Sequence, residues 1–178
     1  MFSLLATFTV TSATETDLSC LKSIRDSMID PNNYLSTTWN FNNNTEGFIC
    51  RFRGVDCWHP DENRVLNLRL SDLGLKGQFP LGLENCTSLS GIANLSFLND
   101  LKLDNNNLAG HIPPQIGQLD RMKVFTVTSN RLSGPVPVFT HNNIPADSFA
   151  NNTGLCGKPL DSCSIHQMKF FTHSKVVL

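Results

Sequence analysis

The sequence lacks the features that mark several large classes of protein. Its 178 residues contain 14 Lys and Arg against 15 Asp and Glu, so there is no excess of positive charge to attract a phosphate backbone. No apolar run reaches the roughly eighteen residues that a membrane-spanning helix needs. We therefore expect no nucleic-acid partner, and the chain as written has no predicted membrane anchor.

Motifs of catalysis are missing as well. The sequence contains no Ser-centred elbow, no His-Glu-x-x-His and no phosphate loop. A zinc site at Cys50, Cys57 and His59 is disfavoured, because the gap between the two thiols is wider than the usual spacing of about two to four residues. The five histidines are scattered along the chain, at His59, His111, His141, His166 and His173. We expect neither an enzyme nor a bound cofactor or metal.

The cysteines indicate an oxidising compartment. Four of the six form two identically spaced pairs, Cys50 with Cys57 and Cys156 with Cys163. Cys20 and Cys86 are expected to be small buried hydrophobes, with a bridge between these two as the alternative.

Export is also indicated by other features. Residues 1–13 combine an apolar stretch with small residues, as a shortened signal peptide would. Glycosylation sequons occur at Asn43, Asn85, Asn94 and Asn151. We expect a secreted, extracellular glycoprotein.

Leucine and asparagine are abundant and recur at fixed positions. The motif L-x-L-x-x-N-x-L-x-G-x-I-P spans residues 101–113 and returns as F-x-V-x-x-N-x-L-x-G-x-V-P at residues 125–137, an offset of 24. An earlier copy at residues 68–80 has Leu73 in place of the Asn and precedes the second copy at an offset of 33. Three copies at related spacing predict a repeat solenoid.

Each copy has a physical interpretation. The L-x-L element alternates with period two, which predicts a short parallel strand with leucines on one face. The side chains of Asn106 and Asn130 can bond backbone groups as a two-rung ladder that Leu73 interrupts. A back segment follows, in which Ile116, Leu119 and Met122 recur every third residue. Stacked copies bury one continuous apolar interior.

The junction at residues 83–101 is irregular. It carries the back-segment pattern twice, with no L-x-L strand between. Because the extra length is a multiple of three, apolar residues stay at every third position. We expect the first two strands still to pair in parallel, with a longer, weakly packed excursion behind them.

The N-terminal region predicts an amphipathic helix over residues 16–30, with Leu18, Leu21, Ile24 and Met28 on its apolar face. A loop anchored by Tyr34, Leu35 and Trp39 follows. The whole chain then divides into a signal peptide (1–13), an N-terminal cap (14–60), about three repeats (61–140), a C-terminal cap (141–163) and an unmatched tail (164–178).

These motifs resemble a known family. The N-terminal helix, Trp39 and Cys50-x-Phe-x-Gly-Val-x-Cys57 resemble the N-terminal cap of plant leucine-rich-repeat receptor kinases, and the repeat is similar to their extracellular subtype. The stretch from Ser148 to Cys163 looks like the C-terminal cap of that family. The resemblance is narrowest to the inactive BIR-type receptors, in Asp30-Pro-Asn-Asn-Tyr-Leu and in Cys57-Trp-His-Pro-Asp-Glu-Asn-Arg-Val.

The resemblance implies an α/β repeat solenoid, a short right-handed stack of leucine-rich-repeat coils with disulfide-bonded N- and C-terminal caps. It also implies binding to SERK-type co-receptor ectodomains or to a peptide, in cell-surface signalling at the plant plasma membrane or in the apoplast. Full-length receptors of this kind continue into further repeats, a membrane span and a kinase-like domain, so a truncated product without these parts is expected.

Binding is expected on the strand face, where free polar side chains alternate with the leucines: Asn67, Arg69, Ser71, Asp72, Lys102, Asp104, Asn105, Thr126, Thr128 and Ser129. The alternative is that these groups are simply solvated. Two other functions remain open, a soluble inhibitor of a secreted enzyme, similar to polygalacturonase inhibitors, and a fragment without function.

Overall fold

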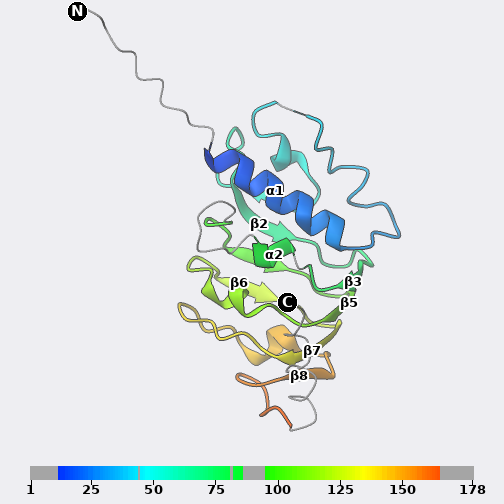
Figure 1. The fold of residues 1–178 in the computed structure, drawn as a ribbon, viewed down its shortest axis with the longest axis vertical. Helices are drawn as coiled ribbons and strands as arrows, with labels where there is room; N and C mark the ends of the chain where they lie inside the picture. The colour runs from blue at the N-terminus through cyan, green and yellow to red at the C-terminus, as the bar shows by residue number, and fades with distance from the viewer. Residues whose placement is uncertain (1–11, 44, 81, 86–94, 165–178) are drawn as a thin grey trace, which may run out of the picture.

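The computed structural model describes residues 12–43, 45–80, 82–85 and 95–164, without the side chains of 12–16, 84 and 85. The elements stack along one axis, from helix α1 (Ser12–Ser27) at one end to strand β8 (Gly154–Cys156) at the other (Figure 1). In the described part of the chain, no helix is long and apolar enough to cross a membrane.

The repeats build a first, mainly parallel sheet in the order β1-β2-β4-β6. It contains β1 (Val55–Cys57), β2 (Val65–Arg69), β4 (Asp100–Lys102) and β6 (Val124–Thr126). β1 is antiparallel to β2, whereas β2, β4 and β6 run parallel. The L-x-L elements thus form the predicted strands.

The register of this sheet follows the sequence offsets. Leu68 pairs with Leu101, and Leu101 pairs with Phe125, so each strand pairs with the matching position of the next copy. The first two repeat strands therefore pair in parallel despite the longer connection, as expected. Leu83, Leu95 and Leu98 of that connection are buried, whereas residues 86–94 lie outside the described part.

A second parallel sheet, which the repeat pattern did not predict, lies further along each coil in the order β3-β5-β7-β8. It adds β3 (Lys76–Gln78), β5 (Asn107–Gly110) and β7 (Arg131–Pro135) to β8. The glycine of each repeat falls here, and Gly77, Gly110 and Gly134 all have positive φ. At Gly110 the φ of 81° favours glycine, and an added Cβ would also require the Gln78 side chain to move.

The back of the stack is short and partly helical. It holds α2 (Gly82–Asn85) and the 3₁₀ helices η2 (Pro114–Gln118) and η3 (Ala146–Phe149). Ile116, Leu119 and Met122, predicted at every third residue, are all buried. One apolar core runs through the stack from α1 to Leu155.

The N-terminal cap differs in detail from the prediction. The helix spans Ser12–Ser27, so it ends before Asp30. Asp30 instead accepts hydrogen bonds from the backbone N–H groups of Tyr34, Leu35 and Ser36, which fold the following loop. The chain has already left the helix before Asp30, because the backbone of Ile29 exchanges hydrogen bonds with that of Lys76.

The remainder of the cap packs on aromatic rings. Trp39 is buried, stacks on Phe52 at 5.5 Å between ring centroids, and donates its indole N–H to Arg53 O. The 3₁₀ helix η1 (Phe48–Arg51) leads into the Cys50–Cys57 disulfide. A second disulfide joins Cys156 and Cys163 at the other end.

One cysteine expectation is wrong. Cys20, expected to be a free buried thiol, is buried but disulfide-bonded. Equal spacing identified the two short-range pairs, whereas Cys20 has no cysteine at that spacing in the sequence and so gave no such signal. The expectation for Cys86, and with it the alternative of a bridge between Cys20 and Cys86, lies outside the described residues.

Candidate functional site

The strand face is the outer surface of β2, β4 and β6. Its rows follow from the register: Asp100 lies between Asn67 and Val124, and Lys102 lies between Arg69 and Thr126. Leu68 and Leu101, between these positions, point into the core and are fully buried. All ten predicted binding residues come from these strands or from the turns that follow them.

A cluster of charged and polar groups crosses the first strands. Asp56 on β1 accepts a hydrogen bond from Asn67 at 3.1 Å and pairs with Arg69 at 2.5 Å. Arg69 also reaches Asp100 of β4 at 3.3 Å. The arginine is about half exposed, so these pairs orient side chains more than they stabilise the fold.

Asp104 organises the centre of the face. Its carboxylate accepts hydrogen bonds from the hydroxyls of Ser71, Thr126 and Thr128, and from the Thr128 N–H. These donors belong to the coils on both sides of Asp104. One carboxylate therefore joins three adjacent coils through polar groups at the surface.

Replacing this carboxylate is expected to destabilise the stack. Asp104→Ala removes the acceptor of four donors, and should lower the free energy of unfolding by about 1–3 kcal/mol in urea denaturation followed by tryptophan fluorescence. Asp104→Asn, which keeps one acceptor oxygen, should lose less. Asp72→Asn is the control, because that exposed carboxylate has no bonded partner among the described residues. Equal losses in the Asp104 and Asp72 variants would contradict the bridging role.

Beneath the face runs an asparagine ladder. The side-chain N–H₂ of Asn106 bonds the carbonyls of Leu70, Leu103 and Asp104, and its oxygen accepts the Leu75 N–H. Asn130 repeats this pattern one coil later. Asn152 repeats it again, so the ladder has three rungs rather than the predicted two.

The residue that precedes each ladder asparagine has a left-handed backbone conformation. The residue that precedes Leu73, at the equivalent position of the first coil, has it too. These residues, Asp72, Asn105, Ser129 and Asn151, have φ of 61°, 53°, 54° and 56°. Asn and Asp tolerate this conformation better than most residues do. The turn projects these side chains beyond the strand ends, at one border of the strand face.

Seven of the ten predicted residues are engaged with a neighbour, contrary to the expectation that their side chains are free. Six of them belong to the groups around Arg69 and Asp104 described above. The seventh, Ser129, accepts a hydrogen bond from the Asn151 side chain. Only Asp72, Lys102 and Asn105 make no side-chain hydrogen bond or ion pair with the described residues. Asp72 and Asn105 are exposed and Lys102 is half-buried. A partner can bind these three side chains without breaking a hydrogen bond or ion pair within the described part of the chain.

Sequence reasoning missed three residues of the site. Asp100 could have been found, because it occupies the position of Asn67 in the next coil. Asn152 follows Asn130 at an offset of 22, so the constant offset of 24 did not reveal it. Asp56 comes from an antiparallel strand of the cap, and no repeat pattern links it to Arg69.

Of the predicted glycosylation sites, only two can be placed. Asn151 is exposed at the border of the strand face, and Asn43 is half-buried with its side-chain oxygen bonded to the Thr45 N–H. The Asn85 side chain and Asn94 lie outside the described residues. Within the described part, no group of three metal-ligating side chains comes together.

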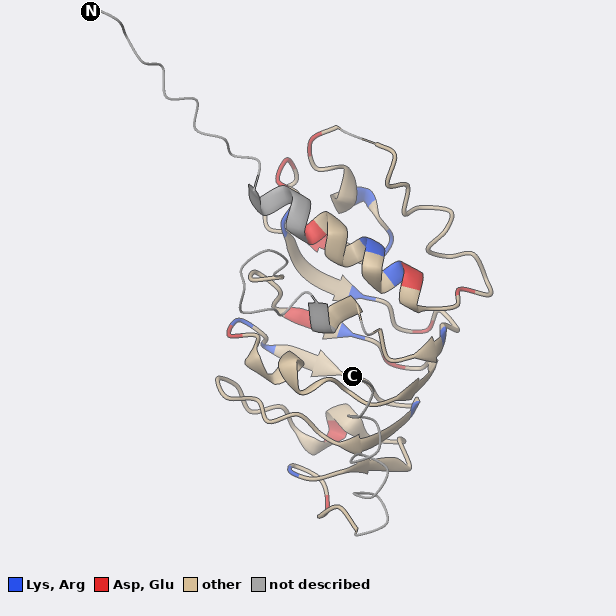
Figure 2. Ribbon diagram, viewed as in Figure 1, with Lys and Arg blue, Asp and Glu red and all other residues tan. Residues whose placement is uncertain are grey.

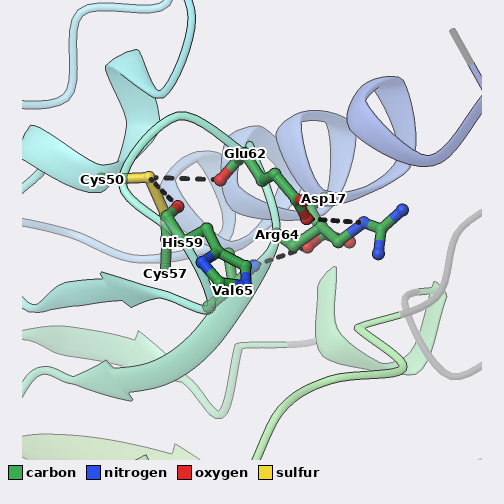
Figure 3. A network of polar contacts seen from close by, with 7 residues as sticks. All are labelled: Asp17, Cys50, Cys57, His59, Glu62, Arg64 and Val65. Atoms are coloured by element: carbon green, nitrogen blue, oxygen red, sulfur yellow. Dashed lines mark hydrogen bonds and ion pairs between the residues drawn. A yellow bond between two sulfur atoms is a disulfide. The ribbon is translucent and has the colours of Figure 1, made fainter. Parts of the chain in front are cut away.

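One ionisable group is deeply buried at the start of β2. Asp17 of α1 accepts the Val65 N–H at 2.7 Å, which ties the cap helix to the first repeat strand (Figure 3). Burial raises the pKa of Asp17 from 3.8 to about 7, and the Val65 hydrogen bond and the Arg64 charge lower it only in part. This carboxyl belongs to the cap rather than to the strand face.

The sequence comparisons agree with these features. A family described as "Leucine rich repeat N-terminal domain" matches residues 14–58. An Arabidopsis thaliana protein described as "Probably inactive leucine-rich repeat receptor-like protein kinase At5g48380" is 39% identical over 201 residues, 90% of this chain and 32% of that protein. The inactive receptor-like kinase BIR2 of the same plant is 44% identical over 107 residues, 60% of this chain and 16% of BIR2.

A solved structure matches as well. A chain in the crystal structure of the BIR3–SERK2 complex from Arabidopsis thaliana is 31% identical, with a TM-score of 0.40, over 83% of this chain and 99% of that chain. The present chain spans about a third or less of the length of the two curated relatives.

Proposed function

Because the chain belongs to the leucine-rich-repeat ectodomains of plant receptor-like kinases, we propose that it is an extracellular protein-interaction module that binds a SERK-type co-receptor ectodomain. The strand face is the contact surface in this proposal. Support for the partner comes from BIR3, which has been solved in complex with SERK2. A peptide that lies along the strand face is the alternative ligand.

The observation that carries the proposal is the organisation of the strand face. Hydrogen bonds and ion pairs across four strands hold its polar groups in place before any partner arrives. Less side-chain entropy is then lost on binding, which favours association. Lys and Arg are interspersed with Asp and Glu along the ribbon (Figure 2). Such mixed polarity suits a protein partner.

Lys102 is the central free group of this surface. It lies between Arg69 and Thr126 in the same row, and both of these are held by neighbouring carboxylates. A partner carboxylate can therefore pair with Lys102 without breaking a contact within the described part of the chain. With only three repeat strands described, the surface is small, so we expect modest affinity.

Reversing the charge of Lys102 tests the proposal. The secreted chain should bind an immobilised SERK2 ectodomain in surface plasmon resonance, and Lys102→Glu should weaken binding by at least about tenfold. Lys22→Glu, the same change on an exposed residue of α1, should leave the affinity unchanged.

Two results would contradict the proposal. One is that the wild-type chain fails to bind any SERK-type ectodomain, and the other is that it binds a panel of polygalacturonases instead. A chain that binds SERK2 equally well with Lys102→Glu would keep the partner but move the contact away from the strand face.

A further inference from the structure

A second group of chemically distinctive side chains lies outside the strand face, at the entry to its strands. The guanidinium carbons of Arg64 and Arg121 lie 5.1 Å and 4.8 Å from the centroid of the Phe97 ring. Trp58 approaches the same ring at 5.9 Å, tilted by 53°. We call these four residues the aromatic–arginine cluster.

The cluster follows from the repeat. Arg64, Phe97 and Arg121 follow one another at offsets of 33 and 24, the same offsets that place Asn67, Asp100 and Val124 side by side. Successive coils therefore stack a cation, an aromatic ring and a second cation in register. Trp58 is attached to this column through its backbone N–H, which bonds Arg64 O at 2.9 Å.

The two arginines differ in what remains available. Arg64 also pairs with Glu62 at 3.5 Å, and Figure 3 shows both residues beside the cap helix. Arg121 is exposed and makes no hydrogen bond or ion pair with a described residue, and its chain neighbour Asp120 pairs with His141. A guanidinium held over an aromatic ring through its carbon can still present N–H donors to a ligand. Arg121 can therefore bind a carboxylate in bidentate fashion while it stays on Phe97.

Trp58 supplies a complementary apolar surface. Trp58 is 46% exposed, whereas the other tryptophan, Trp39, is buried. The rings of His59 and Phe97 approach the indole, and Phe97 in turn carries the two guanidinium groups. Polar and charged groups therefore lie next to a half-exposed indole. A matching ligand has a flat C–H surface that packs on the indole and a carboxylate that pairs with Arg121. Its remaining groups are polar, because the surroundings of the indole are exposed to solvent.

We propose that the aromatic–arginine cluster binds an acidic oligosaccharide, through a uronic-acid carboxylate on Arg121 and the sugar face on Trp58. The site lies at the entry to the strands, outside the ten predicted residues of the strand face, and goes beyond the proposed co-receptor contact. Neutral sugars lack the carboxylate, and acidic peptides lack the rigid C–H face, so both should bind more weakly.

The test uses the secreted chain and a hexamer of α-1,4-linked galacturonic acid. Because Trp39 is buried, a saturable change in tryptophan fluorescence reports on Trp58, and titration calorimetry gives the affinity independently. Arg121→Gln should weaken binding by at least about tenfold. Trp58→Ala should abolish binding in calorimetry, and Trp58→Phe should restore part of it. Arg51→Gln, which removes an exposed arginine outside the cluster, should bind as the wild type does.

The comparison ligands decide the chemical class. Galactose hexamer tests the requirement for the carboxylate, and hexaglutamate tests whether an acidic protein segment is the better occupant. Equal binding of the neutral hexamer, tighter binding of hexaglutamate, or no saturable change with galacturonic acid would each overturn the proposal. Failure of SERK2 binding would not affect it, because Lys102 and Arg121 belong to different surfaces.

Discussion

Asn130→Ala is expected to lower the free energy of unfolding by about 3 kcal/mol or more, the largest effect of any single substitution at the strand face or its ladder. The Asn130 amide is buried and bonds the carbonyls of Leu103, Val127 and Thr128 and the N–H of Leu108. Alanine removes the acceptor of the buried Leu108 N–H in a place that excludes water. It also removes one of two donors from each of the three carbonyls, which keep only the side chains of Asn106 and Asn152 and the Asn105 N–H. Urea unfolding, with the disulfides intact, measures the loss.

Asn105→Gly is the matched control. It removes an exposed amide that makes no side-chain bond within the described part, and glycine accepts the positive φ of 53° at this position. This variant should stay within about 0.5–1 kcal/mol of the wild type. If Asn130→Ala costs no more than Asn105→Gly, the ladder is not a main support of the stack.

The stability of the N-terminal cap should decrease as the pH rises. The pKa of Asp17 has an ordinary value of 3.8 and is about 7 in the fold, so the folded chain binds more protons between these values. Its contribution is fully present below about pH 4, is lost progressively up to about pH 7, and changes no further above that. The difference between these two pKa values corresponds to a loss of a few kcal/mol in the free energy of unfolding.

The variant Asp17→Asn isolates this effect. Its amide oxygen can still accept the Val65 N–H but carries no charge to desolvate. Urea midpoints should coincide near pH 4, and the variant should become the more stable protein at pH 8. Asp26→Asn, on the exposed side of the same helix, controls for loss of a carboxylate. A wild-type stability that rises between pH 5 and pH 8, in parallel with Asp17→Asn, would rule out a buried acid at this position.

The first sheet could be predicted because its determinants are periodic. Hydrophobic residues two apart define each strand, and constant offsets of 33 and 24 define which residues pair. A parallel stack converts these offsets directly into neighbours in space. The same arithmetic gives the column of Arg64, Phe97 and Arg121.

Other features could not be predicted because they join parts of the chain without a common period. The second sheet is formed by the residues on either side of the repeat glycines. These short segments do not show the alternation of hydrophobic and polar residues that predicts a strand. Asp56 meets Arg69 across an antiparallel pair that belongs to the cap. The bonding of Ser71 and Thr126 to Asp104 depends on which rotamers the hydroxyls adopt, and spacing alone does not determine rotamers.

The strands at the two ends of the stack are covered by the caps. A column of parallel strands is an open polymer, because each added strand leaves a new edge that can receive another. Here β1 presents an antiparallel strand at one end of the first sheet, and Ile29 bridges Lys76 in antiparallel fashion at the same end of the second. At the other end, the N–H groups of Val127 and Ser129 donate to the carbonyls of Ser148 and Ala150. In the middle of the stack, the next repeat strand accepts the corresponding bonds. The caps therefore cover the strands at the ends of the repeat stack, whose backbone groups bond within the chain instead of with another copy.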